Sequence, residues 1–288
     1  MTNRSYLFVP ADSERKLAKA ADVGADALIL DLEDAVAAEA RPAARKLAAE
    51  FLQGKDDVWV RINPIDSTDA PLDLAGIMAA GPAGIILPKP RSVDDVQQLA
   101  GQLDQLEAEH ALEAGQTRII SLCTERPEAL FNLHSYAGTG TTSRLHGLSW
   151  GAEDLSAALG ATANRDETGN WLPTFELARS LCLLAAAAAE VIAIDTVFTD
   201  FRDLDGLAKY AANARRDGFG GMLAIHPGQV EIINGAFTPT AEEIDRAEKI
   251  LALFEANPGA GTLGLDGEMI DRPHLLQAQR LLDRKKAK

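Results

Sequence analysis

Cysteine, aromatic residues and long apolar runs are all scarce in this chain of 288 residues. It has 2 cysteines, and aromatic residues make up 5% of the sequence. Cys123 and Cys182 lie in apolar segments without the spacing of a zinc site, so we expect reduced thiols in a core. No apolar run reaches the roughly 18 residues that a membrane span needs, and the apolar stretch near the N-terminus is too short for a signal peptide. These features predict a cytoplasmic protein.

Basic residues are fewer than acidic ones, with 28 Lys and Arg against 43 Asp and Glu and a net charge of −15. Proteins that bind nucleic acid in general need a basic face, so this balance argues against that class. A local basic pocket for a small anion is compatible with the same composition.

Short apolar runs alternate with amphipathic segments along most of the chain. We predict eight strands from these runs, over residues 6–9, 27–33, 58–63, 84–89, 118–125, 145–151, 191–198 and 222–227. Strands that alternate with helices indicate a parallel sheet, and eight such units match a (β/α)₈ TIM barrel over residues 1–237. A doubly wound open sheet is the second possibility. Its dinucleotide-binding form has little support, because no G-x-G-x-x-G follows an early strand.

Most of the predicted strands end in charged or polar residues. The segment "ILDLEDAV" (29–36) shows this pattern, with an apolar half followed by carboxylates. In a TIM barrel the carboxyl ends of the strands form the mouth of the active site, so the barrel explains the pattern. The side chains expected at the mouth are Glu33, Asp34, Arg61, Asn63, Lys89, Glu125, Glu153, Asp154, Asp195, Asp200 and His226.

The pattern changes after residue 237. Residues 238–261 have a Thr-rich start and a Gly-rich stop, which predict a helix. A turn-rich segment and a last helix follow. We therefore expect a C-terminal helical extension, residues 238–288, that covers an active site, either its own or a neighbour's.

The charged residues at the mouth allow more than one chemistry. Glu125 and Asp154 end neighbouring strands and could converge on Mg²⁺, which prefers oxygen ligands. The alternative is that they pair with Arg126 or Arg61. Lys89 could form a Schiff base, although a lysine paired with carboxylates is the commoner case.

Several other residues also allow more than one role. Arg61 could be a structural partner of Glu33 or Asp34, as well as a substrate ligand. His226 is more typical of a hydrogen-bonded structural residue than of a base, and Asp195 and Asp200 could cap loops.

The start of the first predicted helix carries Arg15, Lys16 and Lys19. Such residues usually form a solvated face. They could also form a site for a phosphate-bearing anion, because Lys and Arg bind phosphate readily.

Several stretches together resemble one known family. They are "RSYLFVPADSERKLAKA", "GADALILDLEDAV", "WVRINP", "GIILPK", "GLSWGAEDLSAALGA", "GFGGMLAIHPGQV" and "LDGEMIDRP". In this order they resemble the citrate lyase β-subunit and HpcH/HpaI aldolase superfamily, and within it the malyl-, citramalyl- and citryl-CoA lyases. The resemblance implies a TIM barrel with Mg²⁺, or Mn²⁺, held by Glu125 and Asp154, and Arg61 on the oxygens of the substrate. It also aligns Asp271 with a catalytic acid that such lyases bring from a C-terminal segment, often that of a neighbouring subunit.

The resemblance thus implies a Mg²⁺-dependent carbon–carbon lyase that cleaves a 3-hydroxyacyl-CoA thioester into a keto acid and acetyl- or propionyl-CoA. We expect Glu33, Asp34 and Lys89 to contribute to substrate binding, and the chain to form a homo-oligomer, a trimer or hexamer. For a CoA substrate, the anion site at the first helix would bind the CoA phosphates through Arg15, Lys16 and Lys19. Two alternatives remain: a citrate lyase β-subunit acting on a carrier-protein thioester, and a non-catalytic binding member. Departures from the family pattern, such as "TERPEAL" after the fifth strand, concern the acyl group that is bound.

Overall fold

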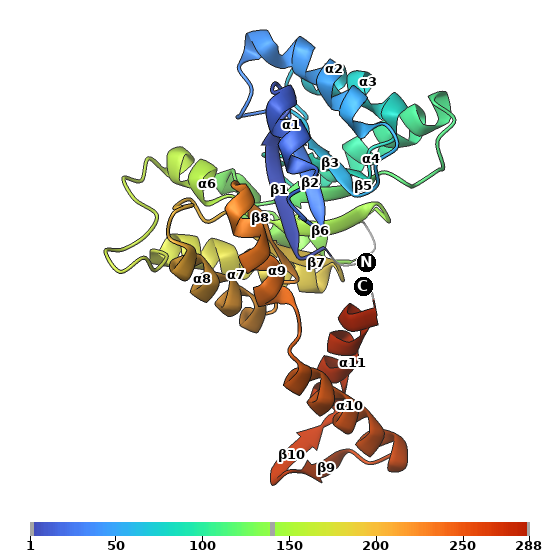
Figure 1. Cartoon of the computed structure of the whole chain (residues 1–288), viewed down its shortest axis with the longest axis vertical. Coiled ribbons are helices and arrows are strands. Elements are labelled where there is room, and N and C mark those ends of the chain that lie inside the picture. The colour runs from blue at the N-terminus through green and yellow to red at the C-terminus, as the bar shows by residue number, and fades with distance from the viewer. Residues whose placement is uncertain (1–2, 139–141, 287–288) are drawn as a thin grey trace.

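Eight parallel strands close into a barrel in the computed structural model, which describes residues 3–138 and 142–286. The closure is made by β1 (Ser5–Pro10), which pairs with both β2 (Ala27–Asp31) and β8 (Gly221–Ala224). The predicted TIM barrel is therefore confirmed and the open sheet is wrong, because the barrel has no free edge. Figure 1 shows the helices around the strands.

Each of the eight strands overlaps its predicted run, and all but β1 end before that run does. The remaining strands are β3 (Val58–Arg61), β4 (Gly84–Leu87), β5 (Arg118–Leu122), β6 (Leu145–Ser149) and β7 (Ile192–Asp195). At the carboxyl end, Glu33, Lys89, Glu125 and His226 thus stand in loops beyond the ladder. From these loops Lys89 contacts both Glu33 and Glu125 at the mouth.

Helices of the barrel cover its outer surface. They are α1 (Glu14–Ala20), α2 (Arg41–Leu52), α3 (Ala70–Ile77), α4 (Val93–Glu109), α5 (Pro127–Phe131), α6 (Ala152–Leu159), α7 (Pro173–Ala188), α8 (Leu204–Asp217) and α9 (Val230–Phe237). Short 3₁₀ helices are η1 (Ala38–Ala40), η2 (Met78–Ala80), η3 (Leu133–Tyr136) and η4 (Pro227–Gln229). In α4, buried residues recur at helical spacing at Val96, Leu99 and Leu103, after an N-cap at Ser92.

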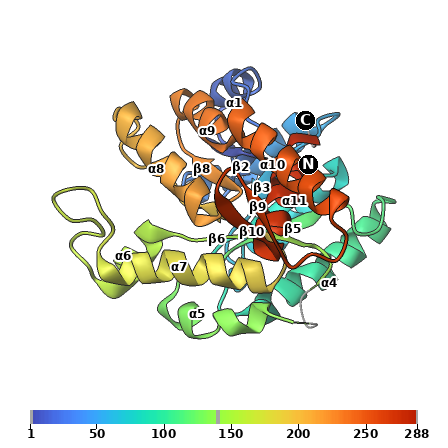
Figure 2. The ribbon, with the colours of Figure 1, turned by 90° about the horizontal axis from the view of Figure 1, so that it is seen from below.

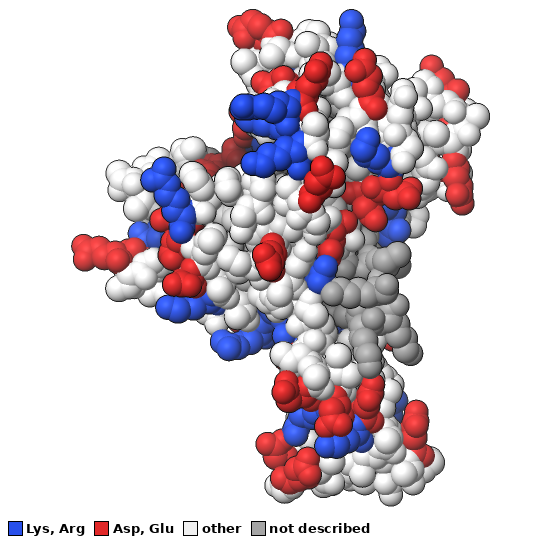
Figure 3. Space-filling view, viewed as in Figure 1, with Lys and Arg blue, Asp and Glu red and all other residues white. Residues whose placement is uncertain are grey.

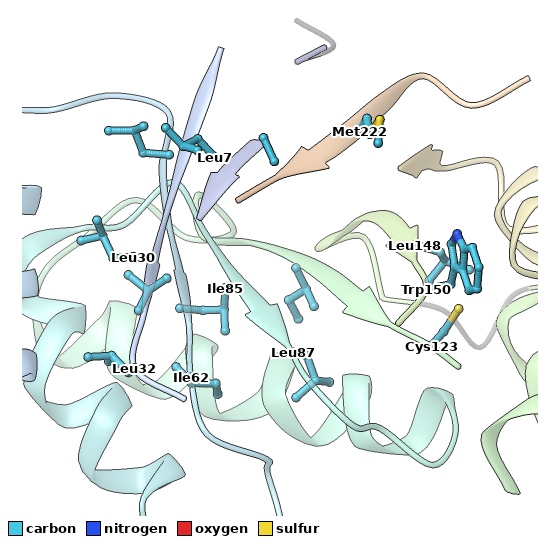
Figure 4. Close-up of a cluster of buried hydrophobic side chains, with 14 of the residues drawn as sticks. Leu7, Leu30, Leu32, Ile62, Ile85, Leu87, Cys123, Leu148, Trp150 and Met222 are labelled. Carbon is cyan, nitrogen blue, oxygen red and sulfur yellow. The ribbon is translucent and has the colours of Figure 1, made fainter. Parts of the chain in front are cut away.

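Strand side chains alternate between two apolar layers. Ile29, Trp59 and Ile86 point into the barrel. Their neighbours Leu30 and Ile85 belong to the layer between sheet and helices, which Figure 4 shows in part. Alternation with a period of two places Asp31 and Arg61, at the ends of β2 and β3, on the same inward face as Ile29 and Trp59.

A separate tail follows α9. It consists of α10 (Ala241–Ala256), an antiparallel hairpin of β9 (Thr262–Leu265) and β10 (Glu268–Asp271), and α11 (Arg272–Lys286). The predicted helix is α10, which begins with a capping box between Thr240 and Glu243. The segment expected to be merely rich in turns forms the hairpin.

The tail has its own apolar cluster, which includes Ile250, Ile270 and Leu282. It projects from one end of the barrel (Figures 1 and 2). Arg215, near the end of α8, forms an ion pair of 2.6 Å with Glu243 of the tail. Because α8 leads directly into β8, the tail is attached at the end of the barrel where the strands begin. None of the helices in the described part of the chain is long and apolar enough to cross a membrane.

Candidate active site

A cavity of about 420 Å³ opens at the carboxyl ends of the strands. Its lining combines charged residues with an apolar wall, and includes Asp31, Arg61, Glu125, Trp150, Asp154 and Ile225. Five of the eleven residues expected at the mouth line this cavity, namely Asp34, Arg61, Glu125, Glu153 and Asp154. Glu33 and Lys89 join them through ion pairs.

Arg61 is fixed by the register of two strands. Asp31 and Arg61 are direct partners in the β2–β3 ladder, and their side chains form a fork, with Nε to Oδ1 at 2.8 Å and Nη2 to Oδ2 at 2.6 Å. Glu33 lies 3.2 Å from Nη1. Burial opposes the charge, but the hydrogen bonds and charge of Asp31, followed by the charge of Glu33, raise the pKa of Arg61. Its structural partners are Asp31 and Glu33, so of the two partners that the sequence suggested, Glu33 is the one that pairs with it.

Lys89 links the acidic residues of the mouth. Its Nζ lies 2.6 Å from Glu33 Oε1, 3.0 Å from Asp34 Oδ2 and 3.1 Å from Asp154 Oδ1. Burial lowers the pKa of Lys89, but the hydrogen bond and charge of Glu33, together with Asp154, outweigh it and raise that pKa. An amine must lose its proton before it attacks a carbonyl, so this geometry opposes the Schiff-base role.

Glu125 is almost completely buried, with 4% of its surface exposed. Its Oε2 accepts a hydrogen bond of 2.6 Å from the backbone N–H of Lys89. Burial, followed by the negative charges of Asp154 and Glu33, raises the pKa of Glu125 well above its usual value. Gly151 makes room for this side chain, because a Cβ there would lie 2.5 Å from Glu125 Cγ.

The carboxylates of Glu125 and Asp154 fit a hard divalent cation. They repel each other in a poorly solvated site, and Arg126, one of the expected partners, instead forms an ion pair of 3.0 Å with Asp66. Across residues 3–138 and 142–286, no three His, Cys, Asp or Glu side chains form a metal-binding group. Mg²⁺ is usually held by only one or two carboxylates with water and substrate, so a pair is sufficient.

Two other candidate residues have local structural roles. His226 Nδ1 accepts a hydrogen bond of 3.1 Å from the N–H of Gly228, and its ring stacks on Phe201. Asp200 caps its own loop by accepting from the N–H of Arg202. At the start of α1, Arg15, Lys16 and Lys19 are all exposed.

Asp195 does not line the cavity at the mouth, where the sequence pattern predicted it. It is fully buried rather than capping a loop, and it accepts hydrogen bonds from Trp150, Arg179 and Tyr210. The partners come from β6–α6, α7 and α8, so only the folded barrel brings them together. The one signal in the sequence was a carboxylate at the end of an apolar strand.

Asp271 stands at the end of β10, in the tail rather than at this mouth. Its Oδ1 lies 2.5 Å from Nδ1 of His274. The tail adjoins the opposite end of its own barrel, where Arg280 shares a cavity with Ile192 and Gly220, next to the starts of β7 and β8.

Comparison with known proteins identifies the family. The family model described as HpcH/HpaI aldolase/citrate lyase matches residues 4–227. The chain belongs to this family. It is 34% identical to the citrate lyase subunit beta of Haemophilus influenzae, over 99% of this chain and 97% of that protein. It is 33% identical to the mitochondrial citramalyl-CoA lyase of Rattus norvegicus, over 97% of this chain and 85% of that protein.

A solved structure extends the likeness to three dimensions. The protein CitE of Mycobacterium tuberculosis, in complex with magnesium, acetoacetate and coenzyme A, superposes with a TM-score of 0.80. It is 31% identical, and the match covers 98% of each chain. The matched fraction includes the tail as well as the barrel of this HpcH/HpaI family member.

Proposed function

We propose that this protein is a Mg²⁺-dependent carbon–carbon lyase that cleaves a 3-hydroxyacyl-CoA thioester into a keto acid and acetyl- or propionyl-CoA. The observation that carries the proposal is the buried Glu125 carboxylate beside Asp154, with Arg61 lining the same cavity. A relative named citramalyl-CoA lyase, and a related structure with magnesium, acetoacetate and coenzyme A, support the same reaction class.

Glu125 and Asp154 would hold the metal ion. When bound, Mg²⁺ supplies Lewis-acid stabilisation of negative charge on the oxygens of the acyl group. The buried position of Glu125 excludes water from one side of the site. Lys89 reduces the repulsion among the carboxylates, since its ammonium contacts Asp154 and its N–H binds Glu125.

Arg61 would stabilise the thioester enolate. The 3-hydroxyl would lose its proton to solvent as its oxygen becomes the carbonyl oxygen of the keto acid. The bond between C2 and C3 of the acyl group breaks, and its electron pair passes to the enolate of the departing CoA thioester. A cation held in place before the reaction stabilises such charge without reorganising. The fork from Asp31 fixes the guanidinium in this way, and Asp271 would deliver the proton that converts the enolate to the CoA thioester.

Asp271 would come from a neighbouring subunit of a ring, which we propose is a trimer. The tail that carries it is attached at the far end of its own barrel. Met269 and Leu276 flank Asp271 in the tail with 63% and 51% of their surfaces exposed, as expected of a segment that docks on another molecule. In this arrangement residues 238–288 cover the neighbour's mouth.

The remaining expectations concern the CoA moiety and the cell compartment. The exposed Arg15, Lys16 and Lys19 follow the carboxyl end of β1, on the side of the mouth, and would contact the phosphates of CoA. Acidic and basic side chains are interspersed on the face in Figure 3, which fits a small anionic ligand better than nucleic acid. The buried free thiols Cys123 and Cys182 favour a reducing compartment such as the cytoplasm.

The test is a product screen with malyl-, citramalyl- and citryl-CoA. Chelator-treated protein should be inactive, and Mg²⁺ or Mn²⁺ should restore release of a keto acid with acetyl-CoA. Glu125→Gln and Asp154→Asn should abolish metal binding and cleavage, whereas the exposed Glu128→Gln should not. Full activity in excess chelator would contradict the proposal.

The same screen separates the other functions. Release of free CoA without a keto acid would indicate hydrolysis of the thioester. Cleavage only of a carrier-protein thioester would favour a citrate lyase β-subunit, and absence of all metal-dependent turnover would favour a binding protein.

A further inference from the structure

Trp150 stands directly before the segment that carries Asp154. Strand β6 ends at Ser149, helix α6 begins at Ala152, and Asp154 lies in the first turn of that helix. The indole is fully buried between sheet and helices, with its ring 4.9 Å from that of Trp171 and nearly perpendicular to it. Only Gly151 separates Trp150 from the start of α6.

The indole N–H donates to a carboxylate that is itself held by several hydrogen bonds. Trp150 Nε1 donates a hydrogen bond of 2.7 Å to Asp195 Oδ1. The same carboxylate accepts from Tyr210 Oη at 3.0 Å and from the N–H of Thr196 at 2.9 Å. Its Oδ2 accepts from Nε of Arg179 at 3.0 Å and from Nη2 at 2.8 Å. A buried indole N–H needs a hydrogen-bond acceptor. The acceptor of Trp150 is the Asp195 carboxylate, whose charge is neutralised by Arg179.

The other side of the segment is fixed by Glu125. The Cα of Gly151 faces this carboxylate so closely that a Cβ would overlap it, and the N–H of Gly151 donates to Thr124 Oγ1 at 3.3 Å. The segment 150–154 is thus held between Asp195, in the outer layer, and Glu125, at the mouth.

We propose that Trp150, anchored by Asp195, is a positioning residue that sets the place of Asp154 relative to Glu125 and thereby the affinity of the site for a divalent cation. The inference rests on the proposed function, because it requires these two carboxylates to be the metal ligands. Neither Trp150 nor Asp195 contacts the ion. They act through the backbone of residues 150–154.

The test measures metal binding directly. Mn²⁺ is titrated into chelator-treated protein and free Mn²⁺ is followed by electron paramagnetic resonance, with calorimetry for Mg²⁺. Trp150→Phe keeps an aromatic ring but removes the N–H, and it should weaken Mn²⁺ binding by about tenfold or more, as observed when groups that orient metal ligands are removed. Saturating Mn²⁺ should recover most of the turnover, because the defect is in affinity.

The matched control is Trp171→Phe. Trp171 belongs to the same aromatic cluster, but its Nε1 lies 3.3 Å from Tyr210 Oη and does not contact Asp195. This variant should bind Mn²⁺ within about twofold of the wild type, although both variants lose an indole N–H. Circular dichroism and thermal unfolding without metal show whether the two variants are equally folded.

Equal Mn²⁺ affinity of folded Trp150→Phe and wild type would overturn the inference. If Trp150→Phe does not fold, Arg179→Lys takes its place, since it keeps Trp150 but loses the planar fork that holds Asp195. It should also weaken Mn²⁺ binding, and unchanged affinity would overturn the inference equally. Wild-type affinity in Glu125→Gln would instead disprove the proposed metal site, and the inference with it.

Discussion

The backbone N–H of Lys89 donates a hydrogen bond of 2.6 Å to Oε2 of Glu125. Lys89 has a φ of 52°, in the left-handed region that non-glycine residues seldom adopt. In this conformation the N–H reaches Glu125 while the side chain reaches Glu33 and Asp154. One residue therefore acts on the acidic mouth through its backbone and through its ammonium.

Lys89→Met should destabilise the protein, because it leaves the buried Glu33 with Arg61 as its remaining cation. We expect the free energy of unfolding to fall by about 3 kcal/mol, as when one partner of a buried ion pair is removed. Urea denaturation measures this, with the exposed Lys46→Met as the control that should change little.

Borohydride treatment of the wild type with a keto acid should give no adduct on Lys89. A trapped adduct would revive the Schiff-base mechanism.

Arg61→Lys should lower kcat/KM strongly, because Lys keeps the charge but loses the fork to Asp31. By comparison with single oxyanion donors, the loss of transition-state stabilisation should be about 2–4 kcal/mol. Arg4 offers a matched control, since it forms a similar fork with Asp26, through Nε at 2.7 Å and Nη2 at 2.6 Å, before β1 begins. Arg4→Lys should affect stability without lowering kcat/KM to the same extent. Wild-type kcat/KM in Arg61→Ala would remove Arg61 from the mechanism.

Asp271 should act across a subunit interface. Asp154→Asn and Asp271→Asn should each be inactive yet folded, and mixing them after mild dissociation and reassembly should restore activity. Mixed rings contain some sites with both native carboxylates, because the two residues of one site come from different chains. Native mass spectrometry establishes that mixed oligomers have formed. If they form and activity stays at the level of the separate variants, Asp271 serves its own barrel or has no catalytic role.

His146 should make stability depend on pH. Burial and then the positive charge of Arg118 lower the pKa of His146 from its usual 6.5 to about 4, and its ring packs against Trp59. Between these values the unfolded chain binds a proton that the folded chain does not. The contribution of the buried, neutral His146 to the free energy of unfolding is therefore complete above pH 6.5 and is lost as the pH falls toward 4.

The matched variant for this effect is His146→Phe, which keeps a ring against Trp59 but cannot titrate. Relative to this variant, the wild type should lose about 3 kcal/mol of unfolding free energy between neutral pH and a pH of about 4. Urea denaturation of both proteins across this range gives the difference at each pH. A difference that does not change with pH would show that His146 is not buried in its neutral form.

The alternation of apolar runs with amphipathic segments was enough to predict the barrel. Each run, such as residues 84–89, is apolar because a strand of a closed parallel barrel is covered on both sides. The charged or polar residues at the ends of most runs, such as Lys89 and Glu125, were enough to predict the side of the mouth, because all parallel strands end on the same side. The C-terminal hairpin was missed, since its short strands carry little periodic signal.

What the sequence by itself determined was therefore the type of fold, the family and the end of the barrel at which the charged residues gather, all of which depend on local patterns along the chain. Only the tertiary structure decided which charges are partners. The β2–β3 register pairs Arg61 with Asp31. Packing of α7 and α8 on the sheet brings Trp150, Arg179 and Tyr210 to Asp195. Such pairs join residues far apart in sequence, and their energies depend on burial and distances of a few ångströms, which only the closed barrel sets.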